Sequence, residues 1–466
     1  MRQGRAPSIY VECTTTFLHD LGTGIPRVVH NVVRHLRSLA PARGYAVVPV
    51  YLDDGVLRKA TVDADGRLRS TAPAHAAPAE RSRARRAMDG IARALPPGPA
   101  RDFVAAPSTQ PGLAQLLRNA SGRLRPKQSA ALGSGRDGGV RIEPGDILLH
   151  ADIDLAADFG AMHATLRKQG TRVCAIVYDL IPLRYSEIWP ALPVRQFRDW
   201  VHRTLAGCDA IFAISRVVKE DIERYFEETP GLSRPRSQVI EWFHLGHDMD
   251  VVEADAQVRP EVAAIFAAGV PVLLSVGWLD PRKNQARLIE ALDALRQRGV
   301  AVKLFLAGRR GFGTDEVHGA LAAHPGVAGD VHLHHDVSDA ELRFAFMHAR
   351  ALVYPSYAEG FGLPLVEALR YGLPVLASDI PIFREIAGAH AVYFDPFDVQ
   401  SMVSALEAFV VRGDYAPARL AQRFTWISWE ESVARLLDLL VHVDPRGGEF
   451  AGRRGRDAGA AARTLR

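Results

Sequence analysis

Residues 354–378 read YPSYAEGFGLPLVEALRYGLPVLAS, and this stretch decides the fold class. A buried strand ends near Pro355, and a glycine-rich loop that carries Glu359 follows it. Pro364 then suits the first turn of a helix, and Glu367 lies one turn inside that helix. A further apolar run predicts the next strand. The order of strand, glycine-rich loop, helix and strand is typical of a doubly wound parallel sheet.

The glycine-rich loop is suited to a diphosphate. The amides of Gly360, Phe361, Gly362 and Leu363 lie at the start of the predicted helix, where the positive end of the helix dipole favours an anion. The two glutamates stand on either side of these amides. A carboxylate can accept hydrogen bonds from two vicinal hydroxyls, so the pair suits two sugar diols, one on each side of a diphosphate. As isolated residues they would be interpreted as a surface loop acid and a first-turn helix acid.

Strands and helices alternate on both sides of this stretch. We therefore predict an α/β protein with two doubly wound domains, at residues 1–245 and 270–424, joined by a linker at 244–269. The predicted strands cover residues 8–13, 46–52, 146–150, 172–178 and 209–214 in the first domain, and 272–276, 303–307, 331–334, 352–354, 375–377 and 392–394 in the second. The predicted helices of the first domain lie at 26–39, 156–169, 194–206 and 216–228.

Basic charge is concentrated in two segments without hydrophobic periodicity. The net charge is +4, but residues 53–140 carry +7 and residues 444–466 carry +3, so the remainder is mildly acidic. We interpret 53–140 as a low-complexity insertion with one short basic helix near 80–95, and 444–466 as a disordered tail. This distribution does not support a nucleic-acid partner. Two alternatives stay open for residues 75–100: peripheral contact with an anionic membrane, or a disordered loop.

The remaining composition indicates a cytoplasmic protein. The three cysteines are far apart and form no CxxC motif, which fits a reducing compartment. We find no apolar run of the roughly 18 residues that would span a bilayer, and we expect no secretory signal.

Several motifs together resemble glycosyltransferase family 4. The sequence EGFGLPLVEAL followed by GLPVLASD resembles that family's E-x7-E motif, and SVGWLDPRKNQARLIEAL resembles its phosphate-binding segment. VYDLIPLRYSEIWP and DAIFAISRVVKEDI resemble the N-domain of its mannosyl- and rhamnosyltransferase-like members. The resemblance covers residues 8–52 and about 142–440. It implies a GT-B fold, with two Rossmann-like domains facing a cleft and a C-terminal helix, at 425–443, crossing back to the N-domain.

The resemblance assigns roles to four residues of the C-domain. Glu367 would hold the ribose hydroxyls of a nucleotide, Glu359 the hydroxyls of the donor sugar, and Lys283 the diphosphate. Many members have an arginine where this chain has Trp278, so Arg282 is a candidate for the second phosphate contact. The alternative for Arg282 is a solvated loop arginine.

The resemblance assigns further candidates to the N-domain. Gly24, in the loop after the first strand, would approach the donor closely because it has no side chain; the alternative is an ordinary turn into a helix. His150 or Asp152, at the end of one predicted strand, would contact the donor sugar near the reacting carbon; the alternative is a satisfied strand-end polar residue. Asp179 ends another predicted strand and could equally cap the following turn.

We expect no metal cofactor. His332 and His334 would share one face of a strand, but they lack suitably placed further ligands. The loop amides, Lys283 and Arg282 could neutralise the leaving diphosphate instead.

The predicted function is therefore a retaining hexosyltransferase. GDP-mannose is the first choice of donor, and the acceptor would be a sugar hydroxyl of a polysaccharide, such as lipopolysaccharide, or of a lipid-linked oligosaccharide. The alternatives are a GT-B sugar-nucleotide epimerase and a non-catalytic nucleotide-sugar-binding subunit. A nicotinamide oxidoreductase is disfavoured because the glycine loop near residue 24 lacks the third glycine of a dinucleotide fingerprint.

Overall fold

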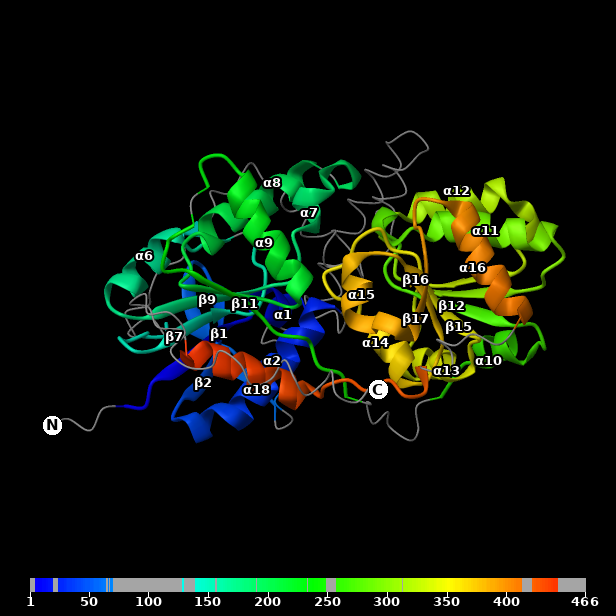
Figure 1. Ribbon diagram of the computed structural model, residues 1–466. Helices are drawn as coiled ribbons and strands as arrows, with labels where there is room; N and C mark the ends of the chain where they lie inside the picture. Colours follow the sequence, from blue (N-terminus) through cyan, green and yellow to red (C-terminus); the bar gives the residue numbers. More distant parts are fainter. Residues whose placement is uncertain are drawn as a thin grey trace, which may run out of the picture.

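The protein is built as two lobes, each with a wholly or mainly parallel β-sheet between layers of helices (Figure 1). The computed structural model describes residues 5–19, 24–63, 66, 68–69, 128–129, 139–155, 157–189, 191–232, 234–248, 257–311, 313–412 and 421–442.

The first lobe contains a seven-stranded sheet with the strand order β11-β10-β9-β7-β1-β2-β3. Its strands are β1 (Ser8–Glu12), β2 (Ala46–Asp53), β3 (Val56–Lys59), β7 (Ile147–His150), β9 (Arg172–Val177), β10 (Ala210–Ala213) and β11 (Val239–Trp242). All neighbours run parallel except β3, which is antiparallel to β2. The central strands are buried apolar runs, as expected for a parallel sheet covered on both faces.

The helices of this lobe follow the strands in the expected alternation. They are α1 (Thr14–His19), α2 (Ile25–Leu39), α6 (Gly160–Lys168), α7 (Ile181–Arg184), α8 (Ala191–Trp200), α9 (Arg216–Glu228), the 3-10 helices η1 (Ala40–Arg43) and η2 (Ser186–Ile188), and the π-helix η3 (Val201–Leu205). Helix α2 has buried apolar residues at 28, 29, 32, 33 and 36, a stripe with helical spacing that faces the core. Two short pairs, β4 (Thr61–Val62) with β5 (Leu68–Arg69) and β6 (Gln128–Ser129) with β8 (Ala157–Asp158), lie outside the main sheet.

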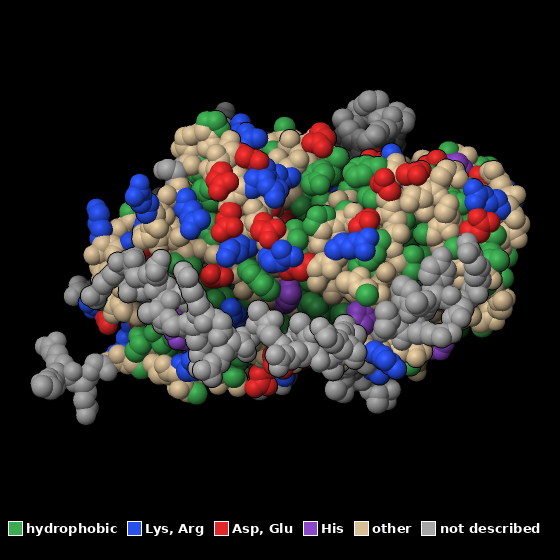
Figure 2. Space-filling view, in the orientation of Figure 1, with side chains coloured by type: hydrophobic (Ala, Val, Ile, Leu, Met, Phe, Trp, Pro, Cys, Tyr) green, Lys and Arg blue, Asp and Glu red, His purple; other side chains and the backbone are tan. Residues whose placement is uncertain are grey.

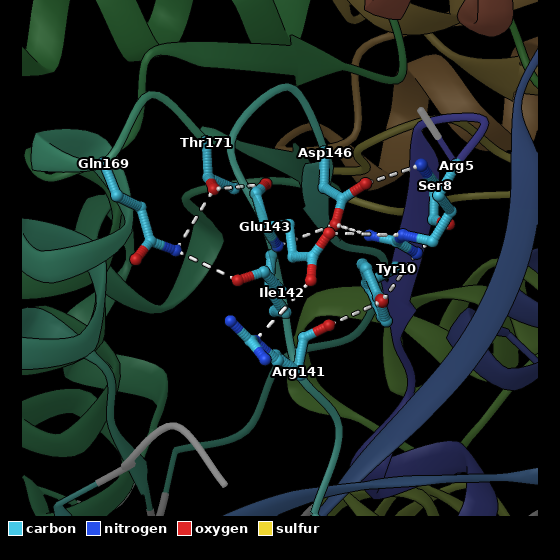
Figure 3. A network of polar contacts seen from close by, with 9 residues as sticks. All are labelled: Arg5, Ser8, Tyr10, Arg141, Ile142, Glu143, Asp146, Gln169 and Thr171. Carbon is cyan, nitrogen blue, oxygen red and sulfur yellow. Dashed lines mark hydrogen bonds and ion pairs between the residues drawn. The ribbon is translucent and has the colours of Figure 1, made fainter. Parts of the chain in front are cut away.

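A polar network joins the amino ends of the strands in this lobe (Figure 3). The buried carboxylate of Asp146 accepts hydrogen bonds from the backbone amides of Ser8 (2.7 Å) and Glu143 (2.8 Å) and from the Arg5 guanidinium (2.6 Å). The Tyr10 hydroxyl donates to the carbonyl of Arg141 at 2.9 Å. These bonds satisfy a buried charge at the amino ends of the strands, away from the carboxyl ends where such sheets bind ligands. We therefore interpret the network as stabilising the fold.

The second lobe contains a six-stranded, fully parallel sheet with the order β14-β13-β12-β15-β16-β17. Its strands are β12 (Val272–Val276), β13 (Lys303–Ala307), β14 (Val331–His334), β15 (Ala351–Tyr354), β16 (Val375–Ser378) and β17 (Ala391–Phe394). Its helices are α10 (Pro260–Ala267), η4 (Pro281–Lys283), α11 (Gln285–Gln297), α12 (Thr314–Ala323), η5 (Pro325–Val327), α13 (Asp339–His348), α14 (Leu363–Arg370), α15 (Pro381–Ala387), η6 (Gly388–His390) and α16 (Val399–Arg412).

The last described helix, α18 (Trp429–His442), packs against α2 of the first lobe (Figure 1). The Arg172 guanidinium donates to the carbonyl of Leu440 at 2.8 Å, and Arg43 forms an ion pair with Asp438 at 2.7 Å. The predicted return of the C-terminal helix to the N-domain is therefore confirmed.

The structure corrects the sequence prediction in three places. The predicted linker at 244–269 contains helix α10, which packs on α13. Strand β11 was not predicted. The segment predicted as a low-complexity insertion does not begin with irregular structure. Strand β3 follows β2 directly, and a turn at Asp54 (φ 45°) and Gly55 (φ 80°) connects the two strands. The predicted helix near 80–95 and the predicted tail at 444–466 lie outside the described residues.

Candidate active site

Three charged side chains meet beyond the carboxyl ends of β12 and β15. One Glu359 carboxylate oxygen lies 2.5 Å from the Lys283 ammonium, and the other lies 2.6 Å from the Arg282 guanidinium. The Glu359 side chain is only 8% exposed. Burial alone would raise the pKa of Glu359, but the charges of Arg282 and Lys283 overcome this effect and lower the pKa to about 2. Glu359 is therefore held as a carboxylate by two cations.

Lys283 is placed by an aromatic ring and a glycine. Its ammonium donates to the Tyr354 hydroxyl at 3.0 Å and lies 4.9 Å from the centre of that ring. Burial lowers the pKa of Lys283, and the neighbouring Glu359 carboxylate opposes this shift. Gly277 has φ 143°, and a Cβ atom there would lie 3.2 Å from the Cε atom of Lys283. The glycine that ends β12 thus makes room for the lysine side chain.

Arg282 does not have the surroundings of a solvated loop arginine. Its side chain is 16% exposed, and its guanidinium also donates to the carbonyl of Ala358 at 2.8 Å. Its backbone amide donates to the Asp280 carboxylate at 2.9 Å, which caps η4. The local turn therefore presents Arg282 and Lys283 side by side, and we call these two residues the cation pair.

The glycine-rich loop leads into α14 through a left-handed residue. Gly362 has φ 100°, and a Cβ atom there would lie 3.0 Å from the ring of Phe383. The predicted helix with Pro364 in its first turn is confirmed, and it begins at Leu363. The Phe361 ring packs against aromatic rings, with its centre 5.9 Å from that of Trp426 and 6.0 Å from that of His244.

Glu367 forms an ion pair with a residue that the sequence analysis missed. The Arg27 guanidinium, from the first turn of α2 in the opposite lobe, donates to the Glu367 carboxylate. The side chains are 26% and 10% exposed, respectively. The signal for Arg27 in the sequence is weak: it follows Gly24-Ile25-Pro26, but 340 residues separate it from its partner.

The two lobes touch at the glycine-rich loop. A Cβ atom at Gly360 would lie 2.1 Å from the Tyr178 carbonyl oxygen, and the Ser215 hydroxyl donates to the Gly360 carbonyl at 3.1 Å. Gly24 also needs glycine, because its φ is 61°, but a Cβ atom there would have no neighbour within 4 Å. The close backbone approach seen in this structure is therefore at Gly360.

A second carboxylate joins the lobes close by. Glu385 of α15 accepts hydrogen bonds from the backbone amides of Arg216 and Val217, both at 2.9 Å, at the start of α9. It also contacts Nε2 of His244 at 2.7 Å. Glu385 thus satisfies free amides of a helix N-terminus in the other lobe.

His150 is buried inside the first lobe. It is 1% exposed, with Nδ1 3.3 Å from the Glu12 carboxylate and Nε2 2.9 Å from Nε2 of His163. Both ring nitrogens are therefore engaged inside the lobe. The structure does not present His150 to a ligand in this conformation.

The two aspartates that follow strand ends, Asp152 and Asp179, accept hydrogen bonds from backbone amides of the first lobe. Asp152 is buried and accepts hydrogen bonds from the amides of Thr16 (2.5 Å) and Ile153 (2.9 Å). Burial and the nearby Glu12 raise the pKa of Asp152 to about 6. Asp179 accepts from the amide of Ile181 at 3.0 Å, which is the capping alternative, and burial raises its pKa.

Within the described ranges, no group of three or more His, Cys, Asp or Glu side chains is placed to hold a metal ion. No helix in the part of the chain that the structure describes has the length and apolar character needed to cross a membrane. On the face shown in Figure 2, the acidic and basic side chains of the described residues are interspersed over both lobes.

The fold is GT-B, which solved structures support. Sucrose-phosphate synthase from Thermosynechococcus elongatus matches with a TM-score of 0.57 and 15% identity, covering 93% of this chain and 98% of that one. Residues 263–422 match the family model described as "Glycosyl transferases group 1". Residues 263–422 thus belong to this glycosyltransferase family, in agreement with the resemblance to family 4.

Similar proteins include bacterial mannosyltransferases. "Serotype-specific mannosyltransferase WbdA" from Escherichia coli is 30% identical over 317 residues, which are 67% of this chain and 39% of that protein. "O-antigen chain mannosyltransferase B" from Escherichia coli is 26% identical over 275 residues, covering 57% of this chain and 69% of that one. The chain thus spans about two fifths of the length of its WbdA relatives.

Proposed function

We propose that this protein is a retaining mannosyltransferase that uses a nucleotide-sugar donor, with GDP-mannose as first choice. The observation that carries the proposal is the cluster of Glu359 with the cation pair, at the carboxyl edge of a parallel sheet, where such sheets bind ligands. The mannosyltransferase names of the similar proteins support the choice of sugar.

In this proposal, different parts of the donor bind to different residues of the site. Glu367 takes the ribose diol, while the cation pair and the loop amides take the diphosphate. Because Glu359 now neutralises the cation pair, an incoming diphosphate would compete for Arg282 and Lys283. The Glu359 carboxylate would then be available to the donor sugar's hydroxyls.

The proposed reaction replaces one C1–O bond by another on the same face of the sugar. The bond from C1 to the diphosphate oxygen breaks, and the acceptor oxygen bonds to C1 through an oxocarbenium-like transition state. The acceptor proton passes to the leaving diphosphate. The cation pair stabilises the negative charge that develops there, so most of its effect falls on the transition state.

The proposed acceptor is a sugar hydroxyl of a bacterial surface polysaccharide, such as O-antigen, or of a lipid-linked oligosaccharide. The proposed location is the cytoplasm, with contact to the inner face of the membrane through residues 75–100, which lie outside the described residues. Each basic residue near an anionic surface contributes about 1 kcal/mol. Removing residues 75–100 should therefore release the protein from anionic liposomes at low salt; unchanged binding would reject this contact.

The test begins with a thermal-shift screen against GDP-, UDP-, dTDP- and ADP-sugars, which reports the donor without knowledge of the acceptor. We expect GDP-mannose to give the largest shift. With a saccharide acceptor, NMR of the first-formed glycoside should show the donor's anomeric configuration. An inverted product would reject the mechanism, and turnover of the donor to an epimer without acceptor would favour the epimerase alternative. A protein that binds a donor but neither transfers nor hydrolyses it would be a binding subunit.

A further inference from the structure

Arg27 belongs to a helix that packs on the core of the first lobe. Helix α2 begins at Ile25 after the left-handed Gly24, and Pro26 stands in its first turn. The buried stripe of α2 faces the lobe core, and α18 packs along the helix. The Arg27 backbone therefore moves with the first lobe, while its guanidinium reaches Glu367 in the second.

The arrangement of charges explains why Glu367 takes its counter-charge from the other lobe. In the second lobe, both members of the cation pair are bound by Glu359. Glu367 is 10% exposed and sits on α14, so an unpaired carboxylate there would be costly. The guanidinium of Arg27 supplies the missing charge and donates directly to a carboxylate oxygen.

This ion pair and a ribose diol cannot use Glu367 in the same way. Two vicinal hydroxyls bind a carboxylate best when both oxygens are turned toward them. In the structure, one oxygen, Oε1, already accepts from Arg27. A ribose diol that binds both carboxylate oxygens of Glu367 would therefore compete with the Arg27 guanidinium for Oε1.

We propose that the Arg27–Glu367 ion pair is a latch between the lobes, which a nucleotide's ribose diol opens by displacing Arg27 from Glu367. The proposal rests on the proposed function, because it takes Glu367 as the ribose ligand. Arg27 is then a residue that sets nucleotide affinity, by competing for the carboxylate. Part of the ribose binding energy is used to break the latch.

The test compares GDP with 2′,3′-dideoxy-GDP by calorimetric titration. The dideoxy compound keeps the base and the diphosphate but has no diol. Any direct contact of Arg27 with the phosphates affects both ligands equally and cancels in the ratio of their dissociation constants. We expect Arg27→Gln to increase the preference for GDP over the dideoxy compound by about 3- to 10-fold, as for loss of a partly exposed ion pair.

A double-mutant cycle and a matched control complete the test. In a Glu367→Gln background, Arg27→Gln should leave the GDP preference unchanged, because the carboxylate for which Arg27 competes is gone. Arg27→Lys, which keeps the charge, should give a smaller increase. Arg37→Gln, an exposed position on the same helix, should behave as wild type.

The outcomes separate the latch from the proposed function. If wild-type protein binds GDP and the preference is the same in Arg27→Gln, the latch is rejected and the function stands. A preference that falls in Arg27→Gln would also reject it, because Arg27 would then support diol binding. If wild-type protein binds none of the nucleotide sugars in the thermal-shift screen, the proposed function fails and the latch fails with it.

Discussion

Replacing Glu359 by Gln is the most informative single perturbation, because that carboxylate balances two buried cations. In the folded protein its pKa falls from 4.5 to about 2, which corresponds to roughly 3 kcal/mol of stabilisation by the ionised form at neutral pH. Burial already lowers the pKa of Lys283, so the variant can recover part of this loss by releasing the lysine proton. We expect Glu359→Gln to lose about 2–3 kcal/mol of unfolding free energy at pH 7.

The pH dependence of this loss has a definite sign. The carboxylate has a lower pKa in the folded state, so its contribution is present above pH 4.5 and disappears as the pH falls toward about 2. For a domain of this size, the loss at pH 7 corresponds to a fall in melting temperature of about 4–12 °C. The difference between variant and wild type should shrink below about pH 4.

Ligand binding and turnover should change in opposite directions in the same variant. Loss of the carboxylate releases the cation pair, so GDP should bind Glu359→Gln at least as tightly as it binds wild type. Transfer should slow by about 10²-fold, or about 2.7 kcal/mol, because Glu359 is proposed to contact the sugar where positive charge develops.

Melting curves at pH 7 and pH 3, calorimetric titration with GDP and transfer rates provide the measurements. Glu290→Gln, at an exposed position of α11, is the matched control. A Glu359→Gln protein that melts within 1 °C or so of wild type at pH 7 would refute the electrostatic reasoning. Loss of GDP affinity would refute the proposal that Glu359 contacts the donor sugar and not the nucleotide.

Two further substitutions test the other parts of the site. Glu367→Gln should weaken GDP binding more than it slows the chemical step, because a ribose contact is similar in the ground and transition states; a kcat effect without loss of affinity, measured by titration and initial rates, would contradict this. Gly360→Ala should reduce the transfer rate by about tenfold or more, because the added methyl group would lie 2.1 Å from the Tyr178 carbonyl oxygen and force the lobes apart. Small-angle scattering should show a larger radius of gyration, and an unchanged radius with full activity would argue against the contact.

Local sequence signals were sufficient for most of the fold. All six strands of the second lobe were predicted, because a strand buried on both faces is a continuous apolar run. The start of α14 followed from glycine and proline, whose backbone preferences are local. The turn between β2 and β3 could also have been predicted, since Asp54-Gly55 is a typical sequence for a two-residue hairpin turn with positive φ at both positions. Strand β11 was missed because it lies at the edge of the sheet and is only partly buried, so its sequence, VIEW, is not a continuous apolar run.

The candidate site was only partly accessible from sequence. The sequence motifs identified Glu359, Glu367 and Lys283 as site candidates. The orientation of a strand-end side chain, in contrast, depends on its neighbours in space. His150 illustrates this: the register of β1 and β7 sets it opposite Glu12, and the pair turns inward.

By itself, the sequence determined the order of strands and helices, the glycine-rich loop and the two acids that flank it, because each depends on preferences of residues close together in the chain. Only the tertiary structure decided which charges pair. Arg27 meets Glu367 and Glu385 meets the start of α9 across the boundary between the lobes. Contacts between residues so far apart in the chain leave no periodic or local pattern, because they depend on how two separately folded sheets face each other.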